Sequence, residues 1–281
     1  MKTAFLILLM IASTWAVAHP GIGIVMDSKG NVYYTDLTQV LKIDLRGNKS
    51  VVVKNVHTHE LYIDSNDNVF GEHLWFGGEK TDDWWHYVWR LTPNGSLEKI
   101  VPPTKGFRSQ HSFVKDVHDN SYWVDDTKHG CLRLRKNSHN QSVVKPVDSC
   151  FNKIHWLHVS RAGNLYFTNG NHLVRVDQTG HVKPLAKAVN THATAQKNND
   201  QYISGLSTDA AENVYVADYT ARVVRKVDRY GNVSVFQTTR TPWSPAGTLM
   251  GRNGDFWLLE CSSTNEVRVE KISKDGTRTI Y

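Results

Sequence analysis

The sequence repeats one pattern six times along its length. Each copy contains a short apolar segment, a tight turn that ends in Asn or Asp, and a run rich in Val, Tyr, Phe and Trp. This order predicts two β-strands joined by a hairpin turn, because polar turn residues separate strands and β-branched and aromatic residues favour them. The residues that close the turns are Asn31, Asn68, Asn120, Asn164, Asn213 and Asp255, at spacings of 37, 52, 44, 49 and 42 residues.

Each copy continues into a second hairpin. Two clear examples are "VVRKVDRYGNVSVF" and "VEKISKDGTRTI", which show a strand, a Gly-containing turn and a strand. Four strands that recur at this interval, without helical periodicity, predict an all-β fold. We expect a six-bladed β-propeller with four antiparallel strands per blade. The first and last copies each contain their own four strands, so the sequence does not show how the ring closes.

The N-terminus has the features of a secretory signal peptide. Lys2 precedes an apolar run from Ala4 to Ile11, and Ala16-Val17-Ala18 matches a cleavage signature. We therefore expect residues 1–18 to be removed, which leaves 19–281 as one secreted or periplasmic propeller domain. The alternative is an uncleaved anchor. No later segment is apolar enough to span a membrane.

Charge and cysteine content exclude some classes of function. The net charge of +6 comes from scattered basic residues, with no Lys/Arg run interleaved with stacking aromatics, so nucleic-acid binding is not expected. No CxxC motif is present, so a thiolate zinc site is not expected either. Cys131 and Cys150 flank one predicted hairpin, and we predict that they form a disulfide, which leaves Cys261 unpaired.

Three histidines occupy equivalent positions in three consecutive copies. His59, His111 and His155 each lie nine residues before the turn residue, where a propeller strand begins near the central funnel. Three imidazoles with an open fourth position suit a catalytic metal, so we predict a divalent metal here, with zinc favoured and calcium, iron or manganese as alternatives. The other interpretation is three hydrogen-bonded histidines at a wet funnel. The remaining copies carry Ile22, Ser204 and Ala246.

A second set of equivalent positions follows each turn residue by five. Asp or Asn at the end of a strand is expected to cap the next turn through side-chain to backbone bonds. His73 departs from this pattern, and Glu72 beside it is a candidate general base, although strand alternation could direct it elsewhere. His57 lies on the same side of an extended strand as His59, so we expect it to support the site beside the metal ligands. His57 and His73 are candidate substrate-binding residues. The six positions are Asp36, His73, Asp125, Asn169, Asp218 and Glu260.

The second copy has an enlarged loop that carries Trp75, Trp84 and Trp85. We expect these side chains to overhang the funnel and to stack on a sugar ring or an apolar substrate, the alternative being packing between blades. Arg108 could hold a carboxylate in a bidentate manner, and Tyr202 could transfer a proton beside a metal.

Four N-glycosylation sequons fall at turns on the opposite face of the predicted ring. In a eukaryotic source, glycans would coat that face and leave the funnel open. The acceptor residues are Asn48, Asn94, Asn140 and Asn232.

The segments "KGNVYYTD" and "AENVYVADYTARVVRKVD" resemble NHL repeats, and the resemblance extends over residues 21 to 281. "VYYTD" is also similar to the YWTD propellers of receptor ectodomains, but the Gly-Asn turn before it favours NHL. The resemblance includes gluconolactonase-type and regucalcin-type enzymes and the peptidyl-hydroxyglycine amidating lyases. It implies a metal near the funnel position of His59, held by Asn and Asp in the first group and by three histidines in the lyases.

These observations predict a metal-dependent hydrolase or lyase that acts on a small molecule in the funnel. Tyr202 or Glu72 would move a proton, Arg108 would hold an anionic group, and the protein would be a monomer. The rival hypothesis is a non-catalytic extracellular propeller that binds a glycan or a peptide. The lack of metal-binding side chains in three of the six copies favours this rival.

Overall fold

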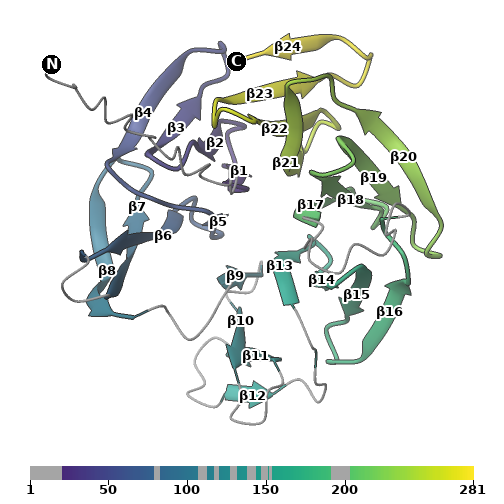
Figure 1. Cartoon of the computed structure of the whole chain (residues 1–281), viewed down its shortest axis with the longest axis horizontal. Coiled ribbons are helices and arrows are strands. Elements are labelled where there is room, and N and C mark those ends of the chain that lie inside the picture. Colours follow the sequence, from purple (N-terminus) through teal and green to yellow (C-terminus); the bar gives the residue numbers. More distant parts are fainter. Residues whose placement is uncertain are drawn as a thin grey trace, which may run out of the picture.

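The protein is an all-β propeller in the computed structural model, and no helix occurs within the residues that the structure describes. Six sheets of four antiparallel strands are arranged around a centre (Figure 1). The described residues are 21–78, 83–106, 113–116, 120–126, 132–137, 144–146, 151, 154–190 and 203–281. Within these ranges no helix could cross a membrane.

The sheets follow one another along the chain. The first contains β1 (Ile24–Met26), β2 (Val32–Thr35), β3 (Gln39–Ile43) and β4 (Lys49–Lys54). The second contains β5 (Leu61–Ile63), β6 (Val69–Phe76), β7 (Trp84–Leu91) and β8 (Leu97–Lys105). The third contains β9 (Phe113–Lys115), β10 (Ser121–Asp126), β11 (Leu132–Asn137) and β12 (Val144–Pro146).

The other three sheets have the same strand order. The fourth contains β13 (Ile154–Val159), β14 (Leu165–Asn169), β15 (His172–Val176) and β16 (Val182–Ala186). The fifth contains β17 (Ile203–Thr208), β18 (Val214–Asp218), β19 (Val223–Val227) and β20 (Val233–Thr238). The sixth contains β21 (Trp243–Met250), β22 (Phe256–Ser262), β23 (Val267–Ile272) and β24 (Arg278–Ile280).

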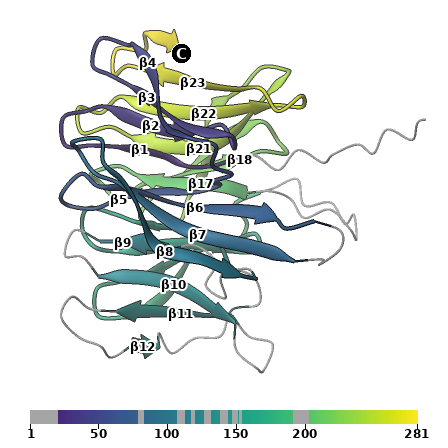
Figure 2. The same cartoon turned by 90° about the vertical axis from the view of Figure 1, so that its left-hand side faces the viewer.

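The ring has two ends. We call the end that holds the hairpin turns between the first and second strands the turn end, and the opposite one the funnel end. Figure 2 views the ring from the side, where the strands run between these two ends. The first strand of each sheet is the innermost, so side chains at its start lie near the axis at the funnel end.

A buried carboxylate organises the turn of the first sheet. Asp27 Oδ1 accepts hydrogen bonds from Lys29 N and Asn31 N, at 3.0 and 2.8 Å, and Oδ2 accepts from Asn31 Nδ2 and Tyr33 Oη, at 2.6 and 3.2 Å. The spacing of acid, Asn and aromatic residue in the repeat therefore has a structural cause. Asp64, Asp116 and Asp209 accept the equivalent bonds from their own turn Asn residues.

Apolar side chains fill the space between neighbouring sheets. Tyr33, Val40 and Val53 of the first sheet pack with Trp89 and Leu91 of the second, and all five are less than a tenth exposed. Burial of such side chains is the main favourable term in folding, at about 1.5–3 kcal/mol for each large apolar residue. Among the described residues, buried clusters of this kind join the first sheet to the second and to the sixth, the third to the fourth, the fourth to the fifth, and the fifth to the sixth.

The ring closes by packing rather than by strand exchange. Ile24 and Tyr34 of the first sheet form one buried cluster with Trp257 and Leu259 of the sixth, and β1 contacts β21. Each of these sheets keeps the four strands of its own sequence copy. The sequence repeat does not show how the ring closes, and these contacts show that the first and sixth sheets pack against each other.

The innermost strands approach closely on one side of the axis. A Cβ atom on Gly247 would lie 2.3 Å from Ile22 O, and one on Gly205 would lie 2.8 Å from Gly247 Cα, so only glycine fits at both positions. Ile22 N and Gly23 N both donate to His59 O, at 2.8 and 2.9 Å. These bonds fix the main chain of His59 against the first sheet.

Candidate functional site

Three histidines meet at the funnel end between the first and second sheets. His57 and His59 lie in the segment that joins β4 to β5, and His73 lies on β6. His57 Nε2 is 3.0 Å from His59 Nε2, and the two rings meet edge to face with centroids 4.7 Å apart. His73 Nδ1 accepts a hydrogen bond from His57 N at 2.7 Å. We call these residues the histidine cluster.

The joining segment holds the cluster because its other side chains are buried. Val56 and Thr58 are almost fully buried, and they alternate with His57 and His59 as expected of an extended chain. Thr58 Oγ1 accepts a hydrogen bond from Trp89 Nε1 at 3.2 Å. The burial of one side of the segment directs the two histidines to the other side.

The hydrogen bonds assign the tautomers in the histidine cluster. His57 Nδ1 is 3.1 Å from Leu37 O, and a carbonyl only accepts, so Nδ1 of His57 carries a proton. In neutral His57, Nε2 then accepts from Nε2–H of His59. Leu37 has a φ of 70°, an uncommon value for this residue type, and the conformation belongs to the turn that presents its carbonyl to His57.

His73 is held in the neutral form. Burial lowers the pKa of His73, and the nearby charges of His57 and Lys99 lower it further. Because Nδ1 accepts the main-chain hydrogen bond, the proton of neutral His73 sits on Nε2. His73 thus has one acceptor nitrogen, bound to His57 N, and one donor nitrogen.

Only part of the predicted metal trio lies within the described residues. His59 is in the cluster, His111 is outside the described residues, and His155 is placed in β13 by its main chain alone, opposite Thr168. Within the described part of the chain, no group of three or more His, Cys, Asp and Glu side chains is arranged to hold a metal. The structure instead brings His57 next to His59, so the trio stays a prediction.

The three predicted tryptophans divide between two faces of the β6–β7 hairpin. Trp75 and Trp85 are cross-strand partners whose rings stack at 6.1 Å, and His73 stacks on Trp75 at 5.3 Å. Trp84 lies on the other face against Phe76, at 5.4 Å. Trp75 and Trp85 are half-buried, and together with His73 and Tyr87 they form a stripe beside the histidine cluster, which we call the aromatic stripe.

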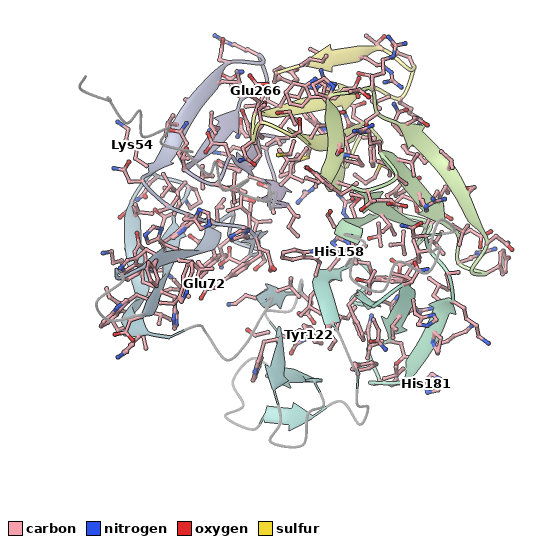
Figure 3. All side chains as sticks on the ribbon, viewed as in Figure 1. Lys54, Glu72, Tyr122, His158, His181 and Glu266 are labelled. Atoms are coloured by element: carbon pink, nitrogen blue, oxygen red, sulfur yellow. The ribbon has the colours of Figure 1, made fainter. Side chains whose placement is uncertain are left out.

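Of the other predicted site residues, only Glu72 lies within the described part of the chain. Glu72, labelled in Figure 3, is half-buried on β6. Strand alternation directs it to the face opposite that of His73. Arg108 and Tyr202 lie outside the described residues, as do Cys131 and Cys150. Cys261 is buried and free, in line with its expected unpaired state.

The capping role predicted for acids at strand ends is confirmed for two of them. Asp36 Oδ1 accepts from Thr38 N and Gln39 N, both at 2.9 Å. Asp218 is fully buried, and it accepts from Ala221 N and from Arg225 Nε, both at 3.0 Å. Both carboxylates therefore stabilise the turns that follow them.

Glu260 is a candidate that sequence reasoning treated only as a cap. It is 1% exposed at the funnel end of β22, and its Oε2 accepts from Arg268 Nε at 2.6 Å. Its Oε1 has no hydrogen-bond partner among the described residues, and burial raises the pKa of the carboxyl. The guanidinium of Arg268 also lies 4.2 Å over the ring of Trp243. The sequence marks Glu260 as different from the other five equivalent positions, because it is the one Glu among them.

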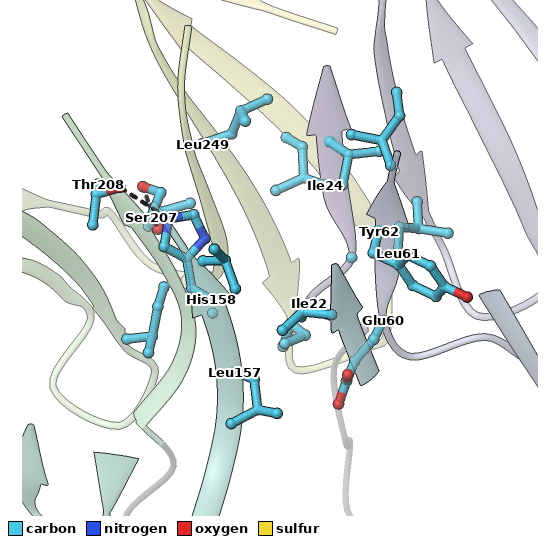
Figure 4. Close-up of a pocket in the computed structure, with 18 of the residues that line it drawn as sticks. Ile22, Ile24, Glu60, Leu61, Tyr62, Leu157, His158, Ser207, Thr208 and Leu249 are labelled. Carbon is cyan, nitrogen blue, oxygen red and sulfur yellow. Dashed lines mark hydrogen bonds between the residues drawn. The ribbon is translucent and has the colours of Figure 1, made fainter. Parts of the chain in front are cut away.

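A central cavity of about 280 Å³ runs between the innermost strands (Figure 4). Ile22, Glu60 and Leu157 line it together with His158, whose Nε2 is 3.0 Å from Thr208 Oγ1. Figure 3 places His158 near the centre of the ring. Burial lowers the pKa of His158 to about 4, so this imidazole is neutral at neutral pH.

Comparisons with known proteins show the fold. No protein-family model matches the chain, and no curated protein matches it in sequence. Virginiamycin B lyase from Staphylococcus aureus is similar in structure, with a TM-score of 0.56 and 12% identity over 92% of this chain and 83% of the lyase. A gluconolactonase from Xanthomonas campestris has a TM-score of 0.61 and 12% identity over 86% of this chain and 83% of that one.

The calcium-binding protein regucalcin from Agrobacterium tumefaciens is also similar, with a TM-score of 0.58 and 14% identity over 87% of this chain and 83% of regucalcin. At these identities the likeness establishes the propeller fold. The structural neighbours are thus propellers of the gluconolactonase, regucalcin and virginiamycin B lyase type.

Proposed function

We propose that this protein is a metal-dependent hydrolase or lyase that acts on a small molecule at the funnel end. The observation that carries the proposal is the approach of His57 Nε2 to His59 Nε2 at 3.0 Å, with Nδ1 of His57 held by Leu37 O. The similar solved structures include a lactonase, a lyase and a calcium-binding propeller. They support the proposal of a hydrolase or lyase on this fold.

The donor set of the histidine cluster fits a divalent metal. Ligand nitrogens around tetrahedral zinc lie about 3.3 Å apart, close to the separation of these two Nε2 atoms. Metal-binding histidines typically donate their second ring N–H to a carbonyl or carboxylate, as His57 does to Leu37. His59 would move its proton to Nδ1 to become a ligand. His111 and His155 are the proposed further ligands.

The bound metal would polarise a substrate oxygen or activate a water molecule. The aromatic stripe would hold a sugar ring or an apolar part of the substrate by stacking, since Trp75 and Trp85 are half-buried and adjoin His73. Tyr202 would move a proton, and Arg108 would hold an anionic group. Glu260 is a further acid at this end, because burial keeps a proton on it to higher pH.

Several finer features belong to the same proposal. We propose that all six sheets are blades of one NHL-type ring, that residues 1–18 are a cleaved signal peptide, and that the mature protein is secreted or periplasmic. A disulfide between Cys131 and Cys150 and glycans at the four sequons are compatible with that location.

A non-catalytic glycan- or peptide-binding propeller is the second candidate. The aromatic stripe favours it, because stacked aromatic rings bind sugars without a metal. In that case Trp85→Ala would remove ligand binding, and metal content would be negligible.

Metal content of the purified protein tests the proposal. We expect near one divalent metal per chain, and a rise in melting temperature on addition of zinc to metal-free protein. His59→Ala should abolish both effects, whereas His172→Ala, which removes an exposed histidine of β15, should leave both unchanged. Protein that carries no metal, and whose melting curve is unmoved by zinc, calcium, iron or manganese, would contradict the proposal.

A further inference from the structure

The turn end of the ring contains an internal example of a carboxylate supplied by a neighbouring sheet. The fourth sheet has Ser160 where four other sheets have an Asp that accepts from the turn Asn. Glu212 of the fifth sheet reaches across, and its Oε2 accepts from Ser160 Oγ, Asn164 Nδ2 and Tyr166 Oη, at 3.2, 2.8 and 2.6 Å. The missing acid is therefore replaced by the next sheet.

The sixth sheet lacks the same acid but receives no such replacement. Gly251 occupies the position of the buried Asp, and Trp257 occupies the position of the turn-end tyrosine. The next sheet in the ring is the first, and its residue equivalent to Glu212 is Gly30. Gly30 has no side chain, so this position of the first sheet supplies no carboxylate to Trp257.

A groove of about 280 Å³ lies at this seam between the first and sixth sheets. Trp257 lines the groove and is 6% exposed, and its Nε1 has no hydrogen-bond partner among the described residues. An indole N–H can only donate, so a buried one without an acceptor is unfavourable. In the fourth sheet the corresponding Tyr166 donates to Glu212.

The groove has basic side chains that can bind an anion. Lys29, Arg252 and Lys271 line it together with Asp44 and Asp255. Lys271 Nζ is 2.8 Å from Asp255 Oδ2. Lys29 and Arg252 are exposed, and no other described residue forms an ion pair with either.

Both carboxylates of the groove already have donors. Asp44 accepts from Arg46 N, Asn48 N and Asn48 Nδ2 at 2.8–2.9 Å, and these bonds lower the pKa of its carboxyl. Asp255 Oδ2 accepts from Asn253 Nδ2 at 2.8 Å in addition to Lys271. The remaining donors, on Trp257, Lys29 and Arg252, are those suited to an added oxyanion.

The groove also has an apolar side. The rings of Trp257 and Tyr281 stack at 5.7 Å with an interplanar angle of 23°, and Met26 and the exposed Leu45 complete the wall. A planar ring next to these side chains would bury apolar surface. The site therefore combines an oxyanion position with a place for an aromatic ring.

We infer that this groove binds a small aromatic carboxylate, whose oxygen accepts from Trp257 Nε1 as Glu212 accepts from Tyr166. Arg252 and Lys29 balance the charge, and the ring of the ligand packs on the Trp257–Tyr281 pair. The site lies at the turn end, opposite the histidine cluster, and does not depend on the proposed metal chemistry.

Nuclear magnetic resonance of the tryptophan indole N–H groups tests this inference directly. The resonance that is absent in Trp257→Phe identifies Trp257. Titration of the wild-type protein with benzoate should shift that resonance downfield with saturation, because a new acceptor deshields the proton. Benzamide has the same ring without the charge and should bind at least about tenfold more weakly.

Two variants separate the groove from non-specific binding. Arg252→Gln removes an exposed charge and should weaken benzoate binding about tenfold. Gly30→Glu places a carboxylate at the position that Glu212 holds in the fifth sheet, and it should abolish benzoate binding. The φ of Gly30 is 92°, against 61° at Glu212, and an added Cβ would lie 3.1 Å from Leu45 Cδ2, so this change carries backbone strain.

Gly163→Glu is the matched control, because it makes the same change at the equivalent turn of the fourth sheet and should leave benzoate binding unchanged. Circular dichroism verifies that each variant is folded. An unmoved Trp257 resonance in wild-type protein, or equal benzoate affinity in wild type and Arg252→Gln, would overturn the inference.

Discussion

The two ends of the ring use the same strands in different ways. At the turn end, a buried carboxylate such as Asp27 is bonded to its own turn and to the tyrosine of its own sheet. At the funnel end, His57 N donates to His73 Nδ1 between the first and second sheets, and His73 stands where the other five copies have Asp, Asn or Glu. The turn-end Asp repeats in four sheets because it organises the hairpin of its own sheet. The histidine cluster departs from the repeat, because the turns at the funnel end do not require imidazole side chains.

The largest expected effect lies at the turn end. Asp27→Ala would leave the donors of Lys29, Asn31 and Tyr33 without their acceptor in a site that is 5% exposed. We expect the free energy of unfolding, measured by urea denaturation, to fall by about 3 kcal/mol. Asp44→Ala removes similar bonds from a solvent-exposed turn and should cost clearly less. Equal losses in both variants would contradict the structural role of the buried turn.

A smaller effect is expected at the seam between the fourth and fifth sheets. Glu212→Gln keeps the shape of the side chain but offers Ser160, Asn164 and Tyr166 a weaker acceptor. Stability should fall by about 1–2 kcal/mol in the same measurement. Glu266→Gln, which alters an exposed turn of the sixth sheet, is the control and should be nearly neutral. A neutral Glu212→Gln would show that the bond across the seam contributes little.

The stability of the folded protein should depend on pH through His158. Its pKa is lowered to about 4 in the folded state, mainly by burial, from an ordinary value of 6.5. A lowered pKa means that the unfolded chain binds the proton first, so stability present above pH 6.5 is lost as the pH falls toward about 4. His158→Asn should flatten the decline of melting temperature over this range. A decline of the same steepness in the variant would assign the acid sensitivity to other groups.

The turn end could be predicted well from the sequence, and the funnel end only in part. Turn residues such as Asn31 and Asn213 mark local hairpins, and the structure has a hairpin at each. Alternation along an extended chain placed His57 beside His59, and their ring contact confirms it. The same rule separates Trp84 from Trp85, because neighbouring residues of β7 face opposite sides.

Other features depend on contacts that sequence patterns do not encode. Glu260 resembles a cap in the sequence, and its burial appears only in the folded structure. The closure of the ring depends on the approach of Gly247 to Ile22, two residues far apart in the chain. The turn-end groove is not predicted by the sequence, because Gly30 and Trp257 line it together although they are far apart in the chain.

The smallest effect on stability is expected at the funnel end without metal. His59 is half-buried in the joining segment, and its ring contacts that of His57. His59→Ala should therefore change the free energy of unfolding of metal-free protein by only about 0.5 kcal/mol. A loss comparable to that of Asp27→Ala would mark the histidine cluster as a structural element.

The central claim is that the histidine cluster is a metal site, and anomalous diffraction from a zinc-soaked crystal tests it most directly. The account predicts an anomalous peak at about 2.0–2.1 Å from both His57 Nε2 and His59 Nε2, with His57 Nδ1 still bonded to Leu37 O. The same soak of His59→Ala crystals should show no peak there. A wild-type map without a peak between the two imidazoles, while their Nε2 atoms stay at hydrogen-bond distance, would contradict the claim.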